Sequence, residues 1–127
     1  MTKKERTDIP LVQMPQLDAT YRITCYEEVN QGISAEQAIT EANRCLTCAD
    51  PQCVSGCPVN IDIPGFINQI QEGHFLEAAH VLKRTSTLPA VCGRVCPQER
   101  QCESKCIYNR MKRPPVAIGY LERIAAD

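Results

Sequence analysis

Two groups of cysteines are the residues of this chain with the clearest potential for chemistry. The chain has nine cysteines among 127 residues, and eight of them fall in these groups. The first group, Cys45, Cys48, Cys53 and Cys57, has the spacing C-x2-C-x4-C-x3-C-P. The second group, Cys92, Cys96, Cys102 and Cys106, has the spacing C-x3-C-P-x4-C-x3-C. Cysteines clustered in this way either form disulfides or bind metal.

The sequence disfavours a disulfide framework. The first 20 residues are charged and contain two prolines, and they hold no apolar stretch of the kind that directs secretion. Thiols of a protein that is not exported stay reduced, and an odd number of cysteines does not pair completely. We therefore expect a cytoplasmic protein whose cysteines bind metal.

The spacing favours an iron–sulfur cluster over zinc. Structural zinc sites usually combine two closely spaced pairs of ligands, and only Cys45 and Cys48 form a C-x2-C pair here. A cysteine followed directly by proline is typical of the ferredoxin spacing C-x2-C-x2-C-x3-C-P. Cys57 and Cys96 both precede a proline. A zinc-stapled interaction module remains the alternative.

The ferredoxin rule predicts how the cysteines divide between two clusters. In two-cluster ferredoxins the cysteine before the proline binds the other cluster. Cluster one then takes Cys45, Cys48 and Cys53, with Cys106 available as its fourth ligand. Cluster two takes Cys57, Cys96 and Cys102. Each cluster would join the two groups, so that cluster assembly and folding become one event.

Cluster two lacks a fourth ligand in this scheme. Spacing alone would choose Cys92, but Cys92 lies among apolar residues in the stretch LPAVCGRVC. A buried free cysteine there would behave as a small hydrophobic residue. The spacing of the cysteines therefore leaves this ligand open.

Helical patterns surround both cysteine groups. Ser34 and Gln37 form the pattern of a capping box at the start of a helix that leads to Cys45. A second helix is expected between Asp62 and Gly73, and a third over 75–85, with Phe75, Ala78, Ala79 and Leu82 facing inward. A short helix is expected over 98–105, and a last one after Pro115.

No segment has a convincing strand pattern. We expect an all-α domain over residues 21–127, an α-helical ferredoxin-like fold whose loops wrap around two iron–sulfur clusters. Residues 1–20 are expected to form an extended or flexible arm.

Composition narrows the possible functions. The net charge is −1, which gives no electrostatic reason to expect nucleic acid or a membrane surface as a partner. No Ser–His–Asp arrangement or pair of carboxylates stands out, so the chain alone is not expected to act on a substrate. Only two Phe, four Tyr and no Trp are present, so metal would supplement a small apolar core.

Three stretches resemble a known family. RCLTCADPQCVSGCPVNIDIPGFI, LPAVCGRVCPQERQCESKC and PVAIGYLERIAAD are similar to the N-terminal iron–sulfur domain of the glutamate synthase small (beta) subunit. Similar domains begin dihydropyrimidine dehydrogenase and occur in the large subunit of the NADH-dependent reduced ferredoxin:NADP oxidoreductase. The resemblance covers residues from about Gly32 to Asp127.

The resemblance implies an α-helical module with two [4Fe–4S] clusters. It would pass electrons between an FAD domain that follows it and a partner, such as the larger subunit of a glutamate synthase, as one component of an NADPH-dependent oxidoreductase. It also implies that Cys45, Cys48, Cys53 and Cys106 bind one cluster. Cys57, Cys96 and Cys102 would bind the other, with Glu122 as its fourth ligand where dihydropyrimidine dehydrogenase has Gln.

The expected carboxylate ligand affects the potential of cluster two, and the chain departs from the family pattern in two respects. An anionic carboxylate in place of a thiolate predicts an atypical, low potential for cluster two. Cys25 lies outside both groups and is interpreted as a spare thiol. No G-x-G-x-x-G motif is present, so FAD and NAD(P)H are expected only in downstream domains that this chain lacks. A free-standing small ferredoxin is the third hypothesis.

Overall fold

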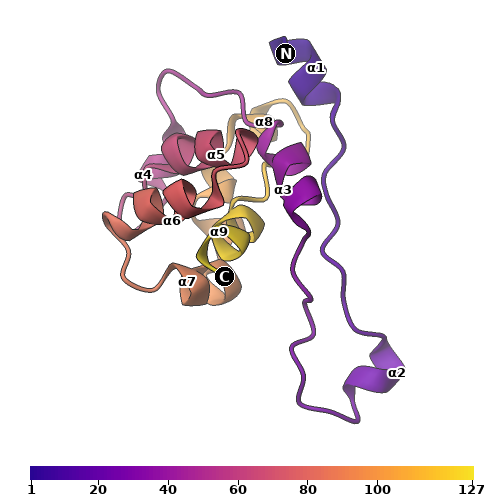
Figure 1. Cartoon of the computed structure of the whole chain (residues 1–127). Coiled ribbons are helices and arrows are strands. Elements are labelled where there is room, and N and C mark those ends of the chain that lie inside the picture. The colour runs from indigo at the N-terminus through magenta and orange to yellow at the C-terminus, as the bar shows by residue number, and fades with distance from the viewer.

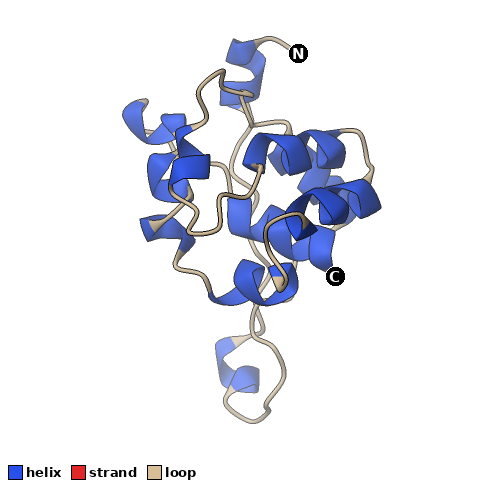
Figure 2. Cartoon of the chain, turned by 90° about the vertical axis from the view of Figure 1, so that its left-hand side faces the viewer, coloured by secondary structure: helices blue, strands red, loops and turns tan.

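The computed structural model describes all 127 residues as a bundle of short helices with one long protruding arm (Figure 1). The α-helices are α1 (Lys3–Asp8), α2 (Ala19–Arg22), α3 (Ala35–Ala42), α4 (Gln52–Ser55), α5 (Ile63–Gln71), α6 (Phe75–Lys83), α7 (Pro89–Val95), α8 (Ile107–Arg110) and α9 (Ile118–Ala126). No strand is present, and the single β-bridge pairs Gln16 with Asn30. The all-α prediction is confirmed (Figure 2).

Local sequence signals set the ends of the two helices on either side of the first cysteine group. Ser34 and Gln37 form the predicted capping box, and α3 ends at Ala42, so that Cys45 and Cys48 lie in the loop beyond it. The Asp62 side chain accepts a hydrogen bond from the Gly65 amide and caps α5. Gly73, with φ +80°, turns the chain between α5 and α6, a conformation that glycine adopts without strain.

The core forms where α5 and α6 pack together and α9 lies across them (Figure 1). Phe66, Ile70, Leu82 and Leu121 are completely buried in it. Along α6 the structure buries Val81 with Ala78 and Leu82, whereas the predicted inward face included Ala79 and Phe75, which are half-buried. The most extensive helix–helix contact joins α7 to α9.

The second cysteine group does not form the predicted continuous helix over 98–105. Two 3-10 turns, Gln98–Arg100 and Glu103–Lys105, occupy this segment. Gln101 between them has φ −112° and ψ −115°, which lies outside the helical region and interrupts the helix. This break turns Cys102 into the interior, where its side chain is buried. The helix α7, which begins at Pro89, was not predicted.

The predicted N-terminal arm is extended only in part. Residues 3–8 form the helix α1, which begins with a capping box between Thr2 and Glu5. The chain then runs outward to α2 and returns, and Leu17 and Gln31 donate backbone hydrogen bonds of 2.9 and 2.8 Å across this excursion, to Val29 and Pro15. The tip of the arm stands clear of the helical body (Figures 1 and 2).

None of the helices has the length and apolar character needed to cross a lipid bilayer.

Candidate metal centres

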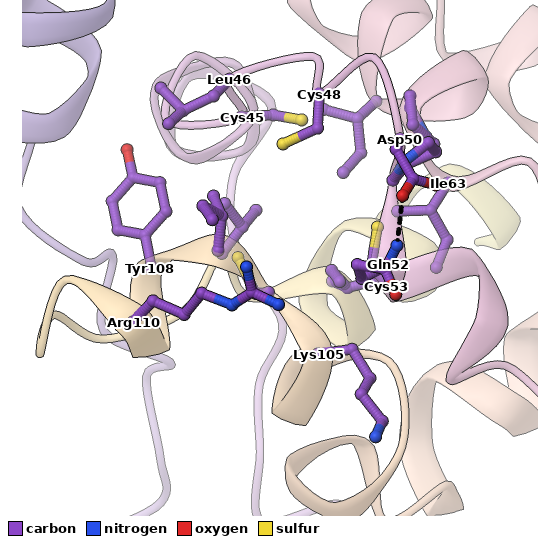
Figure 3. A pocket seen from close by; sticks show the side chains of 17 residues that line it. Cys45, Leu46, Cys48, Asp50, Gln52, Cys53, Ile63, Lys105, Tyr108 and Arg110 are labelled. Atoms are coloured by element: carbon purple, nitrogen blue, oxygen red, sulfur yellow. Dashed lines mark hydrogen bonds between the residues drawn. The ribbon is translucent and has the colours of Figure 1, made fainter.

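Four cysteines from both groups line one cavity. Cys45, Cys48, Cys53 and Cys106 surround a space of about 310 Å³ beside α5 (Figure 3). Ile63 and Ile67 of α5, with Val116 and Ile118 near the start of α9, supply apolar walls. The structure thus brings together the four residues that the sequence assigned to cluster one.

These thiols do not converge on a single point. No three His, Cys, Asp or Glu side chains lie close enough together to hold one metal ion. Cys45, Cys48 and Cys53 instead lie around a shared volume (Figure 3), which Cys106 also lines. Such a donor set has the chemistry of an iron–sulfur site, in which each thiolate binds a different iron of one cluster.

A second group of donors lies between the first cysteine loop, α7 and α9. Burial raises the pKa of Cys96 to about 11, and the nearby Cys92, Glu122 and Cys57 contribute to the shift. Burial raises the pKa of Cys102 to about 12, with contributions from Glu103, Cys57 and Glu122. Cys57, Cys96, Cys102 and Glu122 therefore lie within electrostatic reach of one another.

Glu122 carries a carboxylate oxygen that is buried without a hydrogen-bond partner. The Glu122 side chain is 6% exposed on α9, and the oxygen without a partner is Oε1. Burial raises the pKa of this carboxyl group from its usual 4.5 to about 7. A buried carboxylate without a partner is costly, and a bound metal would satisfy it.

The two remaining cysteines lie in different surroundings. Cys92 is half-buried in α7 near Cys96, and its sulfur is 3.9 Å from the hydroxyl oxygen of Ser86. Cys25 lies in the arm just after α2, and its thiol faces the Arg22 carbonyl at 3.9 Å. Of these two cysteines, only Cys92 lies close enough to Cys96 to compete with Glu122 as a ligand.

Gly93 permits the close approach that places Cys96 next to Glu122. A Cβ atom at Gly93 would lie 2.7 Å from the backbone nitrogen of Arg123 and 2.9 Å from its Cα. Only glycine lets α7 approach the backbone of α9 this closely. The sequence shows the glycine but does not indicate which segment it contacts.

A buried ion pair fixes the loop that carries Cys45. Arg44 Nη1 lies 2.5 Å from Glu41 Oε1, and both side chains are buried. Arg44 also donates hydrogen bonds to the carbonyls of Pro114 and Pro115, while Glu41 accepts one of 2.8 Å from the Ala117 amide. The pair joins α3 to the start of α9. The sequence did not reveal this buried ion pair, because an i,i+3 charge pair on a helix is usually exposed.

The segment that carries the second cysteine group contacts the first turn of α9 and the first cysteine loop. Glu103 accepts a hydrogen bond of 3.2 Å from the Gly119 amide, in the first turn of this helix. Tyr108 Oη lies 2.7 Å from the Arg44 carbonyl, and the Arg44 guanidinium carbon lies 5.0 Å from the centre of the Tyr108 ring. The two contacts between Tyr108 and Arg44 hold the segment around Cys106 against the first cysteine loop.

Burial keeps several thiols protonated in the metal-free chain. It raises the pKa of Cys53 to about 12 and also raises the pKa of Cys45. Backbone amides of Thr47 and Val54 lie near these two sulfurs and oppose the shift. Metal binding would therefore release protons, and the same amides would donate hydrogen bonds to the bound sulfurs.

Comparison with known proteins decides the family. Residues 22–127 match the family described as dihydropyrimidine dehydrogenase domain II, 4Fe-4S cluster. The chain belongs to this family. The resemblance predicted from the cysteine motifs is thereby confirmed, and the chain is an iron–sulfur domain of the kind that transfers electrons.

Curated relatives agree with this assignment. The glutamate synthase [NADPH] small chain of Escherichia coli (strain K12) is 40% identical over 120 residues, which are 94% of this chain and 25% of the relative. That of Azospirillum brasilense is 37% identical over 102 residues, 80% of this chain and 21% of the relative. The NAD-dependent dihydropyrimidine dehydrogenase subunit PreT of E. coli (strain K12) is 38% identical over 101 residues, 80% of this chain and 24% of the relative.

The relatives set the scale of this domain. The chain spans a quarter or less of the length of each of these three proteins. They are components of larger oxidoreductases, as their names state. Neither the zinc-stapled module nor the free-standing ferredoxin is favoured by these matches.

Proposed function

We propose that this chain is a relay domain that holds two [4Fe–4S] clusters and passes single electrons between them. Cys45, Cys48, Cys53 and Cys106 would hold cluster one, and Cys57, Cys96, Cys102 and Glu122 would hold cluster two. The cavity lined by four thiols from both cysteine groups is the observation that carries the proposal. A [4Fe–4S] cluster supplies reversible storage of one electron when it is bound.

The chain itself would position and insulate these clusters. The apolar walls formed by Ile63, Ile67, Val116 and Ile118 would shield one side of a bound cluster from water. The backbone amides of Thr47 and Val54 lie near the sulfurs of Cys45 and Cys53, and the buried Arg44–Glu41 pair holds the first loop against α9. Burial, hydrogen bonds to sulfur and ligand charge are the levers by which a protein sets cluster potential.

Glu122 is the better candidate than Cys92 for the eighth ligand. Glu122 Oε1 is buried without a partner, whereas the Cys92 thiol already faces Ser86. Glu122 projects from α9 and Cys96 follows α7, and these helices are held together at Gly93. An anionic oxygen ligand would give cluster two the lower potential of the two.

The proposed partners follow from the relatives. In the longer protein, domains that bind FAD and NAD(P)H would exchange electrons with this domain, and a larger subunit of the glutamate synthase type would receive them. The cavity for cluster one is open to solvent at an edge that carries the exposed Lys105 and Arg110 (Figure 3). Neither side chain forms an ion pair in the structure. This edge offers a route for electrons into or out of cluster one.

Iron and sulfide analysis of the full chain, prepared without oxygen, tests the proposal. Two clusters predict about eight iron and about eight sulfide per chain. A colourless preparation that contains zinc and no sulfide would refute it in favour of a zinc module.

Two substitutions test the eighth ligand. Glu122→Ala should remove or alter one cluster, as seen in the EPR spectrum of the reduced protein, while Cys92→Ser should keep both. Loss of a cluster only in Cys92→Ser would reverse the assignment. An EPR-monitored titration in which both clusters have ordinary ferredoxin potentials would contradict the predicted low potential of cluster two.

A further inference from the structure

The segment from Arg6 to Val12 crosses the outside of the loop that carries Cys45. Arg6 Nη1 donates hydrogen bonds of 3.1 Å to the Asn43 carbonyl and 2.9 Å to the Cys45 carbonyl. The family match begins at residue 22, so this segment lies outside the region that defines the family. Nothing in the proposed ligand set explains why a half-buried arginine is aimed at a ligand's own backbone.

Other contacts of the segment reach the same walls. Tyr108 Oη, two residues from Cys106, lies 3.1 Å from the Arg6 carbonyl. The Val12 amide donates a hydrogen bond of 2.9 Å to Glu41 Oε2, on the carboxylate that pairs with Arg44. Arg113 donates to the Thr7 carbonyl. The segment is thus tied to both cysteine loops and to the ion pair behind them.

Arg6 also brings a positive charge to the site. No carboxylate pairs with its guanidinium, although Arg44, Arg94, Arg113 and Arg123 all have carboxylate partners. The guanidinium is half-buried, so solvent screens its charge less than that of a fully exposed arginine.

We propose that residues 6–12 form a strap across the outside of the Cys45 loop, which lines the cavity of cluster one, and that Arg6 positions Cys45 and raises the reduction potential of the cluster bound there. This inference rests on the proposed function, since it concerns that same cavity. Reduction adds one negative charge, and a nearby positive charge stabilises the reduced state more than the oxidised state. The two hydrogen bonds from one guanidinium hold the backbone of the Cys45 loop in place.

The test compares three variants of the full chain. Arg6→Gln removes the charge, Arg6→Lys keeps it, and Arg113→Gln removes a different strap contact without changing the charge next to Cys45. Each protein is loaded with iron and sulfide without oxygen, and both midpoint potentials are measured by EPR-monitored titration.

Arg6→Gln should lower one midpoint potential and leave the other in place. At a fixed potential the ratio of reduced to oxidised cluster should fall by up to tenfold, equivalent to about 59 mV for one electron. Arg6→Lys should restore most of the shift, and Arg113→Gln should cause little. Unchanged potentials in Arg6→Gln, or an equal shift in Arg113→Gln, would overturn the tuning role.

Thiol alkylation of the metal-free chain tests the strap separately. Arg6→Gln should free the Cys45 loop and so increase the alkylation rate of Cys45 several-fold relative to Cys102, which the strap does not contact. Loss of the Arg6 charge by itself would slow alkylation of Cys45, so an increase reports the freed loop. Equal changes at both thiols would refute the positioning role. If the unsubstituted chain assembles no cluster, the proposed function and the tuning role fail together, whereas faster alkylation of Cys45 alone would still establish the strap.

Discussion

Replacing Gly93 by alanine should remove cluster two while leaving cluster one in place. Gly93 lies in α7, between Cys92 and Cys96, and faces the backbone of α9 at Arg123, the residue after Glu122. The substitution adds one methyl group at the contact between the two helices that carry proposed ligands of cluster two. Cluster one depends on neither α7 nor Glu122.

The size of the effect follows from the geometry. The new Cβ would lie 2.7 Å from Arg123 N and 2.9 Å from Arg123 Cα. Ordinary carbon contacts are roughly 3.5–4.0 Å, so α9 would have to retreat by roughly 0.8–1 Å. Overpacking of this kind costs roughly 1–3 kcal/mol, and the higher helix propensity of alanine returns up to about 1 kcal/mol. The expected net loss of stability is about 1–2 kcal/mol.

The displacement matters more for the cluster than for the fold. Metal-site donors need to be held to within about 0.5 Å, and a retreat of α9 would exceed this at Glu122. Iron should fall from about eight to about four per chain, and one EPR signal should disappear. Urea unfolding of the metal-free chain measures the loss of stability independently.

Gly119→Ala is the matched control. The three atoms nearest to a Cβ at Gly119 all belong to the Gln98 side chain, with Cδ and Nε2 at 2.5 Å, and a glutamine side chain can rotate away. This variant should keep both clusters. If Gly93→Ala also keeps eight iron and full stability, the contact between α7 and α9 does not determine the geometry of cluster two.

Three further predictions concern the buried pair, pH and the cavity edge. Arg44→Met leaves the buried Glu41 carboxylate unpaired and should cost about 3–5 kcal/mol in urea unfolding, and a loss below about 1 kcal/mol would show that the pair is dispensable. In the metal-free chain the pKa of Glu122 is raised from 4.5 to about 7, so its contribution is fully present below pH 4.5 and is lost as pH rises through about 7. Stability should therefore fall by at most about 3 kcal/mol across this window, and Glu122→Gln should abolish that fall, whereas an unchanged pH profile would exclude Glu122 as its source. Replacing Lys105 and Arg110 together by Glu should slow reduction of cluster one by an anionic reductant several-fold and speed reduction by a cationic viologen, in stopped-flow measurements at low salt. If the substitution leaves the rates with both reductants unchanged, the edge charges do not control access to cluster one.

Local signals predicted much of the fold. The capping box at Ser34 and Gln37, the Asp62 cap and the turn at Gly73 appear where the sequence placed them, because each depends on residues within one helical turn. The segment over 98–105 was predicted incorrectly. Its residues favour a helix locally, but the non-helical backbone of Gln101 breaks it and Cys102 turns into the interior. The helix α1 was not predicted, since charge and proline content indicated an extended or flexible arm.

The sequence by itself determined the class of this protein and predicted how its donors divide between two clusters. The spacing of eight cysteines, two of them followed by proline, was sufficient to predict an iron–sulfur domain, because cluster ligands must come from loops of fixed length. Tertiary structure decided what surrounds those donors. The approach of Gly93 to Arg123 and the contact of Arg6 with Cys45 join residues 30 and 39 positions apart, and the packing of α9 buries Glu122 without a partner. Such contacts depend on how the helices pack, and no local pattern encodes them.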